Sequence, residues 1–195
     1  MKVLIATGGS GGHIFPALQT ALQLKKQGVE VIFVGTLLMA EAKIRSEGFE
    51  CYILDAQGFV GRSISGFYRF SSLMCKAFAQ SVTILRTCKP DKIIGFGGYG
   101  SFPVVLAGCV LGVPCMIHEQ NIMPGKANRI LAKLVKKVAV AFKASVRFFG
   151  KKAVWTGCPC HDQPSNRLKS EICKSFGLNP QGVIIRSIPL FFQKI

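Results

Sequence analysis

The sequence predicts an α/β fold, a Rossmann-like parallel sheet with helices on both faces. Short apolar runs rich in β-branched residues alternate with stretches whose apolar residues recur at helical spacing. Two glycine clusters each follow one of these runs and precede a helical stretch. The 49% of hydrophobic residues excludes a disordered chain, and the lack of self-similar stretches excludes a repeat array. Such alternation is typical of a parallel sheet with crossover helices.

The first half of the chain establishes the alternation. Its opening run is β-branched and aliphatic and ends in glycines, and the helical stretch that follows is closed by Gly28. A second apolar run leads to a short helical stretch closed by Gly48. We therefore expect strand, helix, strand, helix and strand, in that order, at residues 2–6, 14–26, 29–34, 40–47 and 51–54.

The second half continues the series with three more helices and three more strands. Residues 93–117 have no charged residue and are long enough to cross a bilayer, but six glycines and two prolines divide them into strand, loop, helix and strand. We interpret them as part of a soluble core. The expected elements alternate, starting with a helix, over residues 67–87, 92–95, 102–111, 113–117, 125–135 and 137–141.

The two glycine clusters predict a phosphate site. They are Thr7-Gly-Gly-Ser-Gly-Gly-His13 and Gly95-Phe-Gly-Gly-Tyr-Gly-Ser101. Each lies at the carboxyl edge of the predicted sheet and opens a helix, where main-chain N–H groups hold phosphate. Two such loops predict a diphosphate or two phosphate-bearing ligands. Ile14 breaks the dinucleotide fingerprint, and the chain has no Gly-Lys-Ser or Gly-Lys-Thr of a P-loop.

Two stretches with histidine are candidates for chemistry. His13 stands where a glycine loop meets a helix N-terminus, a place suited to a neutral imidazole acting as a base; the alternative is a capping or core histidine. His118-Glu-Gln-Asn121 follows the strand expected at 113–117 and groups an imidazole, a carboxylate and two amides. Its alternative is a polar strand end that hydrogen-bonds neighbouring loops.

The chain is strongly basic, with 25 Lys and Arg against nine Asp and Glu and a formal charge of +16. Residues 126–152 have nine basic residues and no acidic one, and residues 56–90 have five basic residues among aromatic ones. This pattern is typical of a surface on an anionic membrane, although the apolar stripe of a helix more commonly faces the core. A nucleic-acid binder would explain the charge but not the glycine loops, so no nucleic-acid partner is expected.

The eight cysteines lie mostly within apolar runs, and no secretory signal is recognisable before them, so we expect free thiols. Cys158, Cys160 and His161 lack the second ligand pair that a structural zinc site needs. We therefore predict no metal and no cofactor.

Three stretches, in order and at compatible spacing, resemble one bacterial family. They are Thr7-Gly-Gly-Ser-Gly-Gly-His-Ile-Phe-Pro16, Gly95-Phe-Gly-Gly-Tyr-Gly-Ser-Phe-Pro103 and His118-Glu-Gln-Asn121. The family is that of the undecaprenyldiphospho-muramoylpentapeptide β-N-acetylglucosaminyltransferases of glycosyltransferase family 28. The resemblance runs from residue 1 to about residue 177 and covers the family's amino-terminal half. It implies the amino-terminal domain of a glycosyltransferase B fold, with the carboxyl-terminal domain missing.

The resemblance implies an activity and a location. Members of the family transfer GlcNAc from UDP-GlcNAc to lipid I with inversion, forming lipid II for peptidoglycan synthesis at the cytoplasmic face of the bacterial inner membrane. UDP-GlcNAc, lipid I, an anionic membrane surface and cell-wall synthesis proteins are the partners this implies. A non-catalytic, membrane-associated module that binds lipid diphosphates is the alternative function.

The resemblance also implies roles for individual residues. His13 is the candidate base or acceptor-orienting residue, with Glu119 as its rival. The donor nucleotide sugar would contact Ser10, Gly11, Gly12 and Asn121. The acceptor diphosphate would be held by Gly97, Gly98, Tyr99 and Ser101.

Two departures from the family pattern concern the end of the chain. Where the family commonly has Gly-Asn-Pro-Val-Arg, this chain has Gly157-Cys-Pro-Cys-His161, and His161 could replace the donor-binding Arg only when protonated. We expect residues 1–160 to form the acceptor- and membrane-binding domain and residues 161–195 to be an interdomain remnant with an apolar tail, as truncation or a shifted frame would leave it. The tail is expected to be poorly ordered and prone to aggregation.

Overall fold

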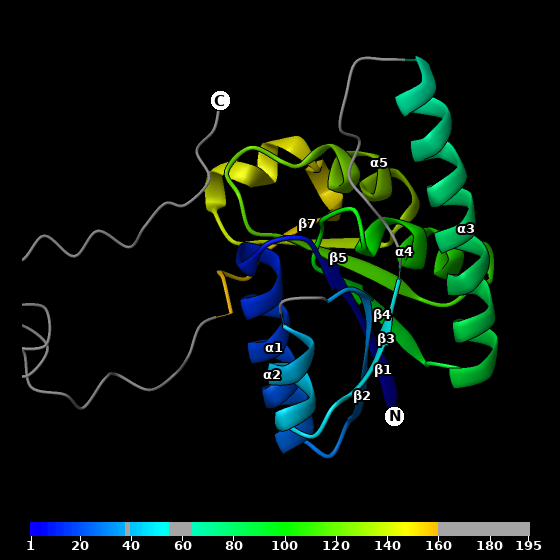
Figure 1. Ribbon diagram of the computed structural model, residues 1–195. Helices are drawn as coiled ribbons and strands as arrows, with labels where there is room; N and C mark the ends of the chain where they lie inside the picture. The colour runs from blue at the N-terminus through cyan, green and yellow to red at the C-terminus, as the bar shows by residue number, and fades with distance from the viewer. Residues whose placement is uncertain (38–39, 55–63, 160–195) are drawn as a thin grey trace, which may run out of the picture. The chain divides into compact units, whose positions relative to one another are not determined.

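The computed structural model describes residues 1–37, 40–54 and 64–159. Its centre is a parallel sheet of seven strands in the order β3-β2-β1-β4-β5-β6-β7 (Figure 1). The chain starts at β1, builds outward to β3, then crosses back and builds outward from β4. The order therefore reverses between β1 and β4, which is where doubly wound sheets bind ligands. The strands are β1 Lys2–Gly8, β2 Glu30–Thr36, β3 Glu50–Ile53, β4 Lys92–Gly95, β5 Cys115–Glu119, β6 Lys137–Val140 and β7 Ala153–Trp155.

Helices cover both faces of the sheet, with α1 and α2 on one face and α3 and α4 on the other (Figure 1). The α-helices are α1 Gly11–Lys26, α2 Glu41–Ser46, α3 Ile64–Cys88, α4 Ser101–Val110 and α5 Lys126–Leu134. Two 3₁₀ helices, η1 Lys143–Phe148 and η2 Gly150–Lys152, lead into β7.

Successive residues of the central strands pack alternately into two separate hydrophobic cores. In β1, Val3 and Ile5 belong to the cluster that includes residues of α1 and α2, whereas Leu4 and Ala6 belong to the cluster that includes residues of α3, α4 and α5. A strand buried on both faces has no polar positions to alternate with. For this reason the central strands appear in the sequence as continuous apolar runs.

Helix α4 lies close to the sheet because glycine stands at the points of contact. A Cβ on Gly108 of α4 would lie 2.3 Å from Cδ1 of Ile93, and one on Gly95 of β4 would lie 2.6 Å from Cγ2 of Val105. These separations leave no room for a side chain. The glycine loop that precedes α4 is thereby held against the carboxyl edge of the sheet.

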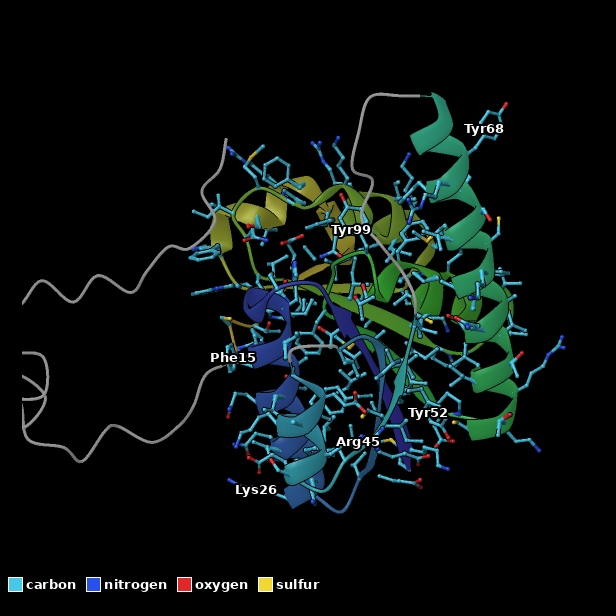
Figure 2. The ribbon with its side chains drawn as sticks, in the orientation of Figure 1. Phe15, Lys26, Arg45, Tyr52, Tyr68 and Tyr99 are labelled. Atoms are coloured by element: carbon cyan, nitrogen blue, oxygen red, sulfur yellow. The ribbon has the colours of Figure 1, made fainter. Side chains whose placement is uncertain are left out.

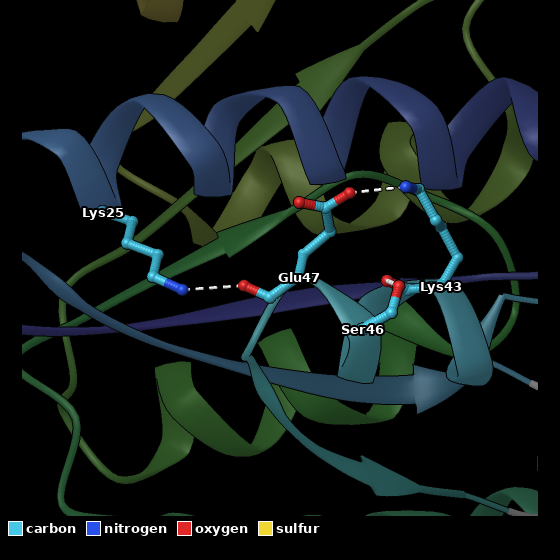
Figure 3. Close-up of polar contacts among 4 residues, drawn as sticks. All are labelled: Lys25, Lys43, Ser46 and Glu47. Carbon is cyan, nitrogen blue, oxygen red and sulfur yellow. Dashed lines mark hydrogen bonds and ion pairs between the residues drawn. The ribbon is translucent and has the colours of Figure 1, made fainter.

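Polar contacts connect the C-terminal ends of α1 and α2, at the edge of the sheet away from the glycine loops (Figure 3). Lys25 donates from Nζ to the main-chain oxygen of Glu47 over 2.7 Å, and Lys43 pairs with the Glu47 carboxylate. Lys26, Arg45 and Tyr52 lie toward this end (Figure 2). The hydrogen bond from Lys25 connects α1 to the end of α2. The exposed pair of Lys43 and Glu47 lies within α2 and its C-cap and contributes little to stability.

The predicted fold class and the order of the predicted elements are confirmed. Residues 93–117 form β4, α4 and β5, as expected, and no helix within the described ranges has the length and apolar character to span a bilayer. The expected start of α1 was wrong by one turn, since it begins at Gly11. The expected end of β5 was wrong as well, because the strand continues through Glu119, and β7 was not among the expected strands. The interdomain remnant and apolar tail at 161–195 lie outside the described residues.

Candidate functional site

The two glycine loops meet at the carboxyl edge of the sheet, where the strand order reverses. Gly98 has a left-handed φ of 79°, and a Cβ there would lie 2.1 Å from the main-chain oxygen of Gly8. A Cβ on Gly100 would lie 2.5 Å from the main-chain nitrogen of Thr36 at the end of β2. Main chain therefore packs directly on main chain, and only glycine allows this approach.

His13 lies at the junction of all three motifs. It projects from the first turn of α1, its ring Nδ1 is 3.1 Å from Oε1 of Gln120, and a Cβ on Gly97 would lie 3.2 Å from both Nδ1 and Cε1. His13 is half-buried and does not cap α1, because Ser10 occupies the N-cap position. His13 is thus neither the N-cap residue nor fully buried, and its ring faces the second glycine loop.

Glu119 is buried at the end of β5 with both carboxylate oxygens occupied. Oε1 accepts hydrogen bonds from the main-chain N and the Nδ2 of Asn121, at 2.9 and 3.0 Å. Oε2 accepts from the main-chain N of Gly125 at 3.1 Å and from Nδ2 of Asn128 at 2.9 Å. With its side chain 1% exposed, Glu119 fastens the loop after β5 to the N-terminus of α5.

The N-terminus of α1 leaves main-chain donors open. Ser10 makes no side-chain cap, the first turn has no acidic residue, and Gly11 and Gly12 are exposed. The first N–H groups of a helix have no partner within it and lie at the positive end of its dipole. Phe15 is exposed beside Gly11 and points away from the sheet (Figure 2). This end of α1 is suited to an anion.

The residues predicted for the acceptor diphosphate divide into accessible and buried ones. Tyr99 is 47% exposed, with its ring set edge-on to Phe70 at 6.5 Å, and Gly98 is half-buried. Gly97 is buried behind His13. Ser101 is also buried, and its hydroxyl donates a hydrogen bond to the main-chain oxygen of Gly98 over 3.3 Å. The Ser101 hydroxyl is thus used within the loop.

Asn121 is exposed on the loop after β5, although its amide donates to Glu119. The hydroxyl of Ser145 in η1 donates to the main-chain oxygens of Asn121 and Ile122, at 3.1 and 3.0 Å. These bonds fix the loop from the other side. Asn121 is therefore presented to solvent on a constrained main chain.

His118 is a buried packing residue. Its Nε2 donates to the main-chain oxygen of Gly157 over 3.0 Å, and its ring lies 5.4 Å from that of Phe96. Burial lowers the pKa of His118, although the Gly157 carbonyl and the Glu119 carboxylate act in the opposite direction. The neutral ring links β5 to the segment after β7.

Metal-binding groups are lacking in the part of the chain that the structure describes: no three His, Cys, Asp or Glu side chains gather there. Cys158 is exposed, and Cys160 and His161 lie outside the described residues. The absence of a metal and the replacement of an arginine by His161 stay predictions.

Three residues near the site received no role from the sequence. Gln120 connects His13 to the main chain of Phe96, Asn128 connects α5 to Glu119, and Thr36 packs under Gly8 and Gly100. Gln120 stood within a recognised motif, which was a usable signal. Nothing local in the sequence distinguishes Asn128 or Thr36.

The fold is a doubly wound sheet with two glycine loops at its switch point, and the chain belongs to glycosyltransferase family 28. Residues 3–140 match the family model described as the glycosyltransferase family 28 N-terminal domain.

The chain is also similar to individual proteins along most of its own length. A protein of Thermodesulfovibrio yellowstonii, named as the UDP-N-acetylglucosamine--N-acetylmuramyl-(pentapeptide) pyrophosphoryl-undecaprenol N-acetylglucosamine transferase, is 36% identical over 95% of this chain and 52% of its own length. One of the same name from Acidithiobacillus ferrooxidans is 40% identical over 83% of this chain and 44% of its own length. The crystal structure of Acinetobacter baumannii MurG matches with a TM-score of 0.69 and 31% identity, over 86% of this chain and 48% of that one. The chain spans about half the length of the relatives it matches.

The contact between the glycine loops predicts a difference between two glycines of similar φ. Gly98→Ala is expected to lower the free energy of unfolding by about 3 kcal/mol or more, for two reasons. The added methyl group would clash with the Gly8 carbonyl, and alanine is strained in the left-handed conformation. Gly112→Ala, at a φ of 74° with open space around it, is expected to cost only about 1–2 kcal/mol. Urea unfolding of both variants measures this, and equal losses would contradict the close contact.

The four hydrogen bonds to Glu119 predict that this residue stabilises the folded chain. Glu119→Gln replaces one acceptor oxygen by a donor that faces other donors, so the free energy of unfolding is expected to fall by about 2–4 kcal/mol. His13→Gln, at a half-buried position, is expected to lose less than about 1 kcal/mol. Thermal and urea unfolding of both variants measure this difference, and a stable Glu119→Gln variant would contradict it.

Proposed function

We propose that this chain is the acceptor-binding half of an inverting transferase that moves GlcNAc from UDP-GlcNAc to lipid I, forming lipid II. The observation that carries the proposal is the junction at His13, where the first glycine loop, the second glycine loop and Gln120 meet. Family membership and relatives named as transferases of this kind support it.

The proposed reaction is a single in-line displacement. The O4 hydroxyl of the muramoyl sugar attacks C1 of GlcNAc, the bond from C1 to the diphosphate oxygen breaks, and UDP leaves. His13 takes the hydroxyl proton on Nε2, acting as the general base. The open N–H groups of Gly11 and Gly12, at the N-terminus of α1, stabilise the charge that develops on the diphosphate.

We propose His13 rather than Glu119 as the base. A base needs a free lone pair within reach of the acceptor hydroxyl, and the four hydrogen bonds to Glu119 occupy both of its oxygens. His13 is half-buried beside the loop proposed for the acceptor diphosphate. In that loop we assign the diphosphate to Gly98 and Tyr99, with main-chain groups contributing at Gly97 and Ser101. Ser10 and Asn121 would contact the donor.

Transfer is tested in a chimera, because the chain spans about half the length of its relatives. Residues 1–156 are fused to the carboxyl-terminal half of the Acidithiobacillus ferrooxidans relative, and transfer of radiolabelled GlcNAc to a lipid I analogue is measured. His13→Gln is expected to lower kcat by about 10²–10⁴-fold, since a positioned base contributes about that much, with lipid I binding nearly unchanged.

Gln19→Ala, a change on the same helix, is the control and is expected to keep kcat. A His13→Gln chimera that transfers GlcNAc at the unaltered rate would overturn the role of His13. Lipid I binding without transfer in any chimera would favour the non-catalytic module that binds lipid diphosphates.

We further propose that α5 lies on the anionic membrane at the cytoplasmic face of the inner membrane. Its exposed face mixes Ile130 and Leu134, 52% and 50% exposed, with the cations Lys126, Arg129 and Lys133. Apolar and cationic residues on one helix face suit the headgroup region of an anionic bilayer. Helix α5 also begins beside the loop after β5, which brings this face near the proposed acceptor site.

The aromatic stretch of α3 contributes less to this surface than its composition indicates. Phe78, Val82 and Ile84 pack against the core, and Tyr68 is the strongly exposed aromatic residue among the described side chains of α3 (Figure 2). For Phe78, Val82 and Ile84, the apolar stripe of this helix therefore faces the core, which was the alternative considered.

Membrane association is measured by sedimentation with vesicles containing phosphatidylglycerol. The double variant Arg129→Glu/Lys133→Glu is expected to bind at least about 25-fold more weakly, since each basic residue near an anionic surface contributes about 1 kcal/mol. Lys25→Glu/Lys26→Glu, at the opposite end of the sheet, makes the same change in net charge and is expected to bind at most about threefold more weakly. Equal weakening by both variants would mean that net charge alone attracts the chain.

A further inference from the structure

We propose that Gln120 is a positioning residue that fixes His13 as the tautomer with hydrogen on Nδ1 and a lone pair on Nε2. This inference deepens the proposed function and rests on His13 being its base. It concerns a residue to which the sequence motifs assigned no role.

The orientation of the Gln120 amide follows from its other neighbour. Nε2 of Gln120 is 2.9 Å from the main-chain oxygen of Phe96, and a carbonyl oxygen can only accept a hydrogen bond. The amide nitrogen must therefore face Phe96. Its oxygen is then turned toward His13, where it lies 3.1 Å from Nδ1.

The orientation of the amide determines where the imidazole proton lies. An amide oxygen has no hydrogen to donate, so the contact with Gln120 requires a hydrogen on Nδ1 of His13. In a neutral imidazole the other nitrogen, Nε2, then carries the lone pair. This is the reverse of the tautomer that predominates in an unconstrained histidine in water.

The ring is placed so that Nε2 lies along the second glycine loop. The two carbons on either side of Nε2 are Cε1, 3.2 Å from where a Cβ of Gly97 would be, and Cδ2, 3.5 Å from where one of Gly98 would be. Among the residues that the structure describes, Gln120 is the hydrogen-bond partner of the ring, through Nδ1. Nε2 is thus the nitrogen left to accept the proton of the acceptor sugar's hydroxyl when the acceptor is bound at this loop.

Gln120 is itself held by its neighbours. The Glu119 carboxylate fixes the main chain of Asn121, and Asn128 donates from Nδ2 to the main-chain oxygen of His118 over 3.3 Å. When the hydroxyl proton moves to Nε2, the Gln120 oxygen also stabilises the imidazolium, because both ring nitrogens are then donors. A single amide thereby supplies the correct tautomer before the transfer and a favourable contact after it.

The tautomer is measured by long-range ¹H–¹⁵N NMR of the uniformly labelled chain of 195 residues in alkaline buffer without substrate, with His13 assigned by its loss in His13→Gln. We expect a protonated Nδ1 and an unprotonated Nε2 in His13. His118 serves as an internal contrast, because its Nε2 donates to Gly157 and its proton lies on the opposite nitrogen.

Gln120→Met removes the acceptor at similar volume and is expected to shift His13 toward the Nε2–H form. Gln19→Met, a change on the helix that carries His13, is expected to leave the proton on Nδ1. Gln120→Glu retains an acceptor and is expected to retain the Nδ1–H form. A wild-type His13 protonated on Nε2 would overturn the proposal even if no variant folds. An unchanged tautomer in a folded Gln120→Met chain would overturn it as well.

The same change in the chimera separates this inference from the proposed function. Gln120→Met is expected to lower kcat by at least about tenfold, within the roughly 10²–10⁴-fold that a positioned base contributes, with little effect on KM. A tautomer that depends on Gln120, together with a His13→Gln chimera of undiminished kcat, would leave the positioning role intact and refute the general base.

Discussion

The site depends on one close approach, that of the main chain of Gly98 to the main chain of Gly8. It brings the loop after β4 against the loop after β1, and so places the N-terminal turns of α1 and α4 at the same edge of the sheet. The separation of those loops is set by atoms that every residue has. The side chains then only have to fill the space around them, and His13 does so from the first turn of α1.

A second layer of polar contacts holds the loop after β5 against this junction. Glu119 connects that loop to α5, Ser145 connects it to η1, and Gln120 connects it to the second glycine loop. Each bond is buried or half-buried, where an unpaired group would be costly. The loop that carries Gln120 is consequently held by α5, by η1 and by the second glycine loop.

Much of the fold could be predicted from the sequence, because strands buried on both faces and helices ended by glycine leave strong local patterns. The end of β5 could not be, since His118 and Glu119 are polar and their partners, Gly157 for His118 Nε2 and Asn128 for Glu119, come from other segments of the chain. The glycine loops and His13 were found as motifs, whereas the burial of Gly97 and Ser101 depends on tertiary packing. The role of Gln120 depends on partners 24 and 107 residues away, at distances no local pattern encodes.

The glycine floor of the site has a consequence for selectivity. A surface made of main-chain N–H and C=O groups recognises charge and shape, but it offers the same groups to every ligand that carries a phosphate. For the proposed acceptor, choice between ligands would therefore come from the side chains around the loops, and Phe15 and Tyr99 are the exposed aromatic ones there among the described residues. Substitutions of these side chains would alter which ligand is preferred while the main chain of the loops stays the same, so in the proposed function affinity for a diphosphate and selectivity for the group attached to it are set by different atoms.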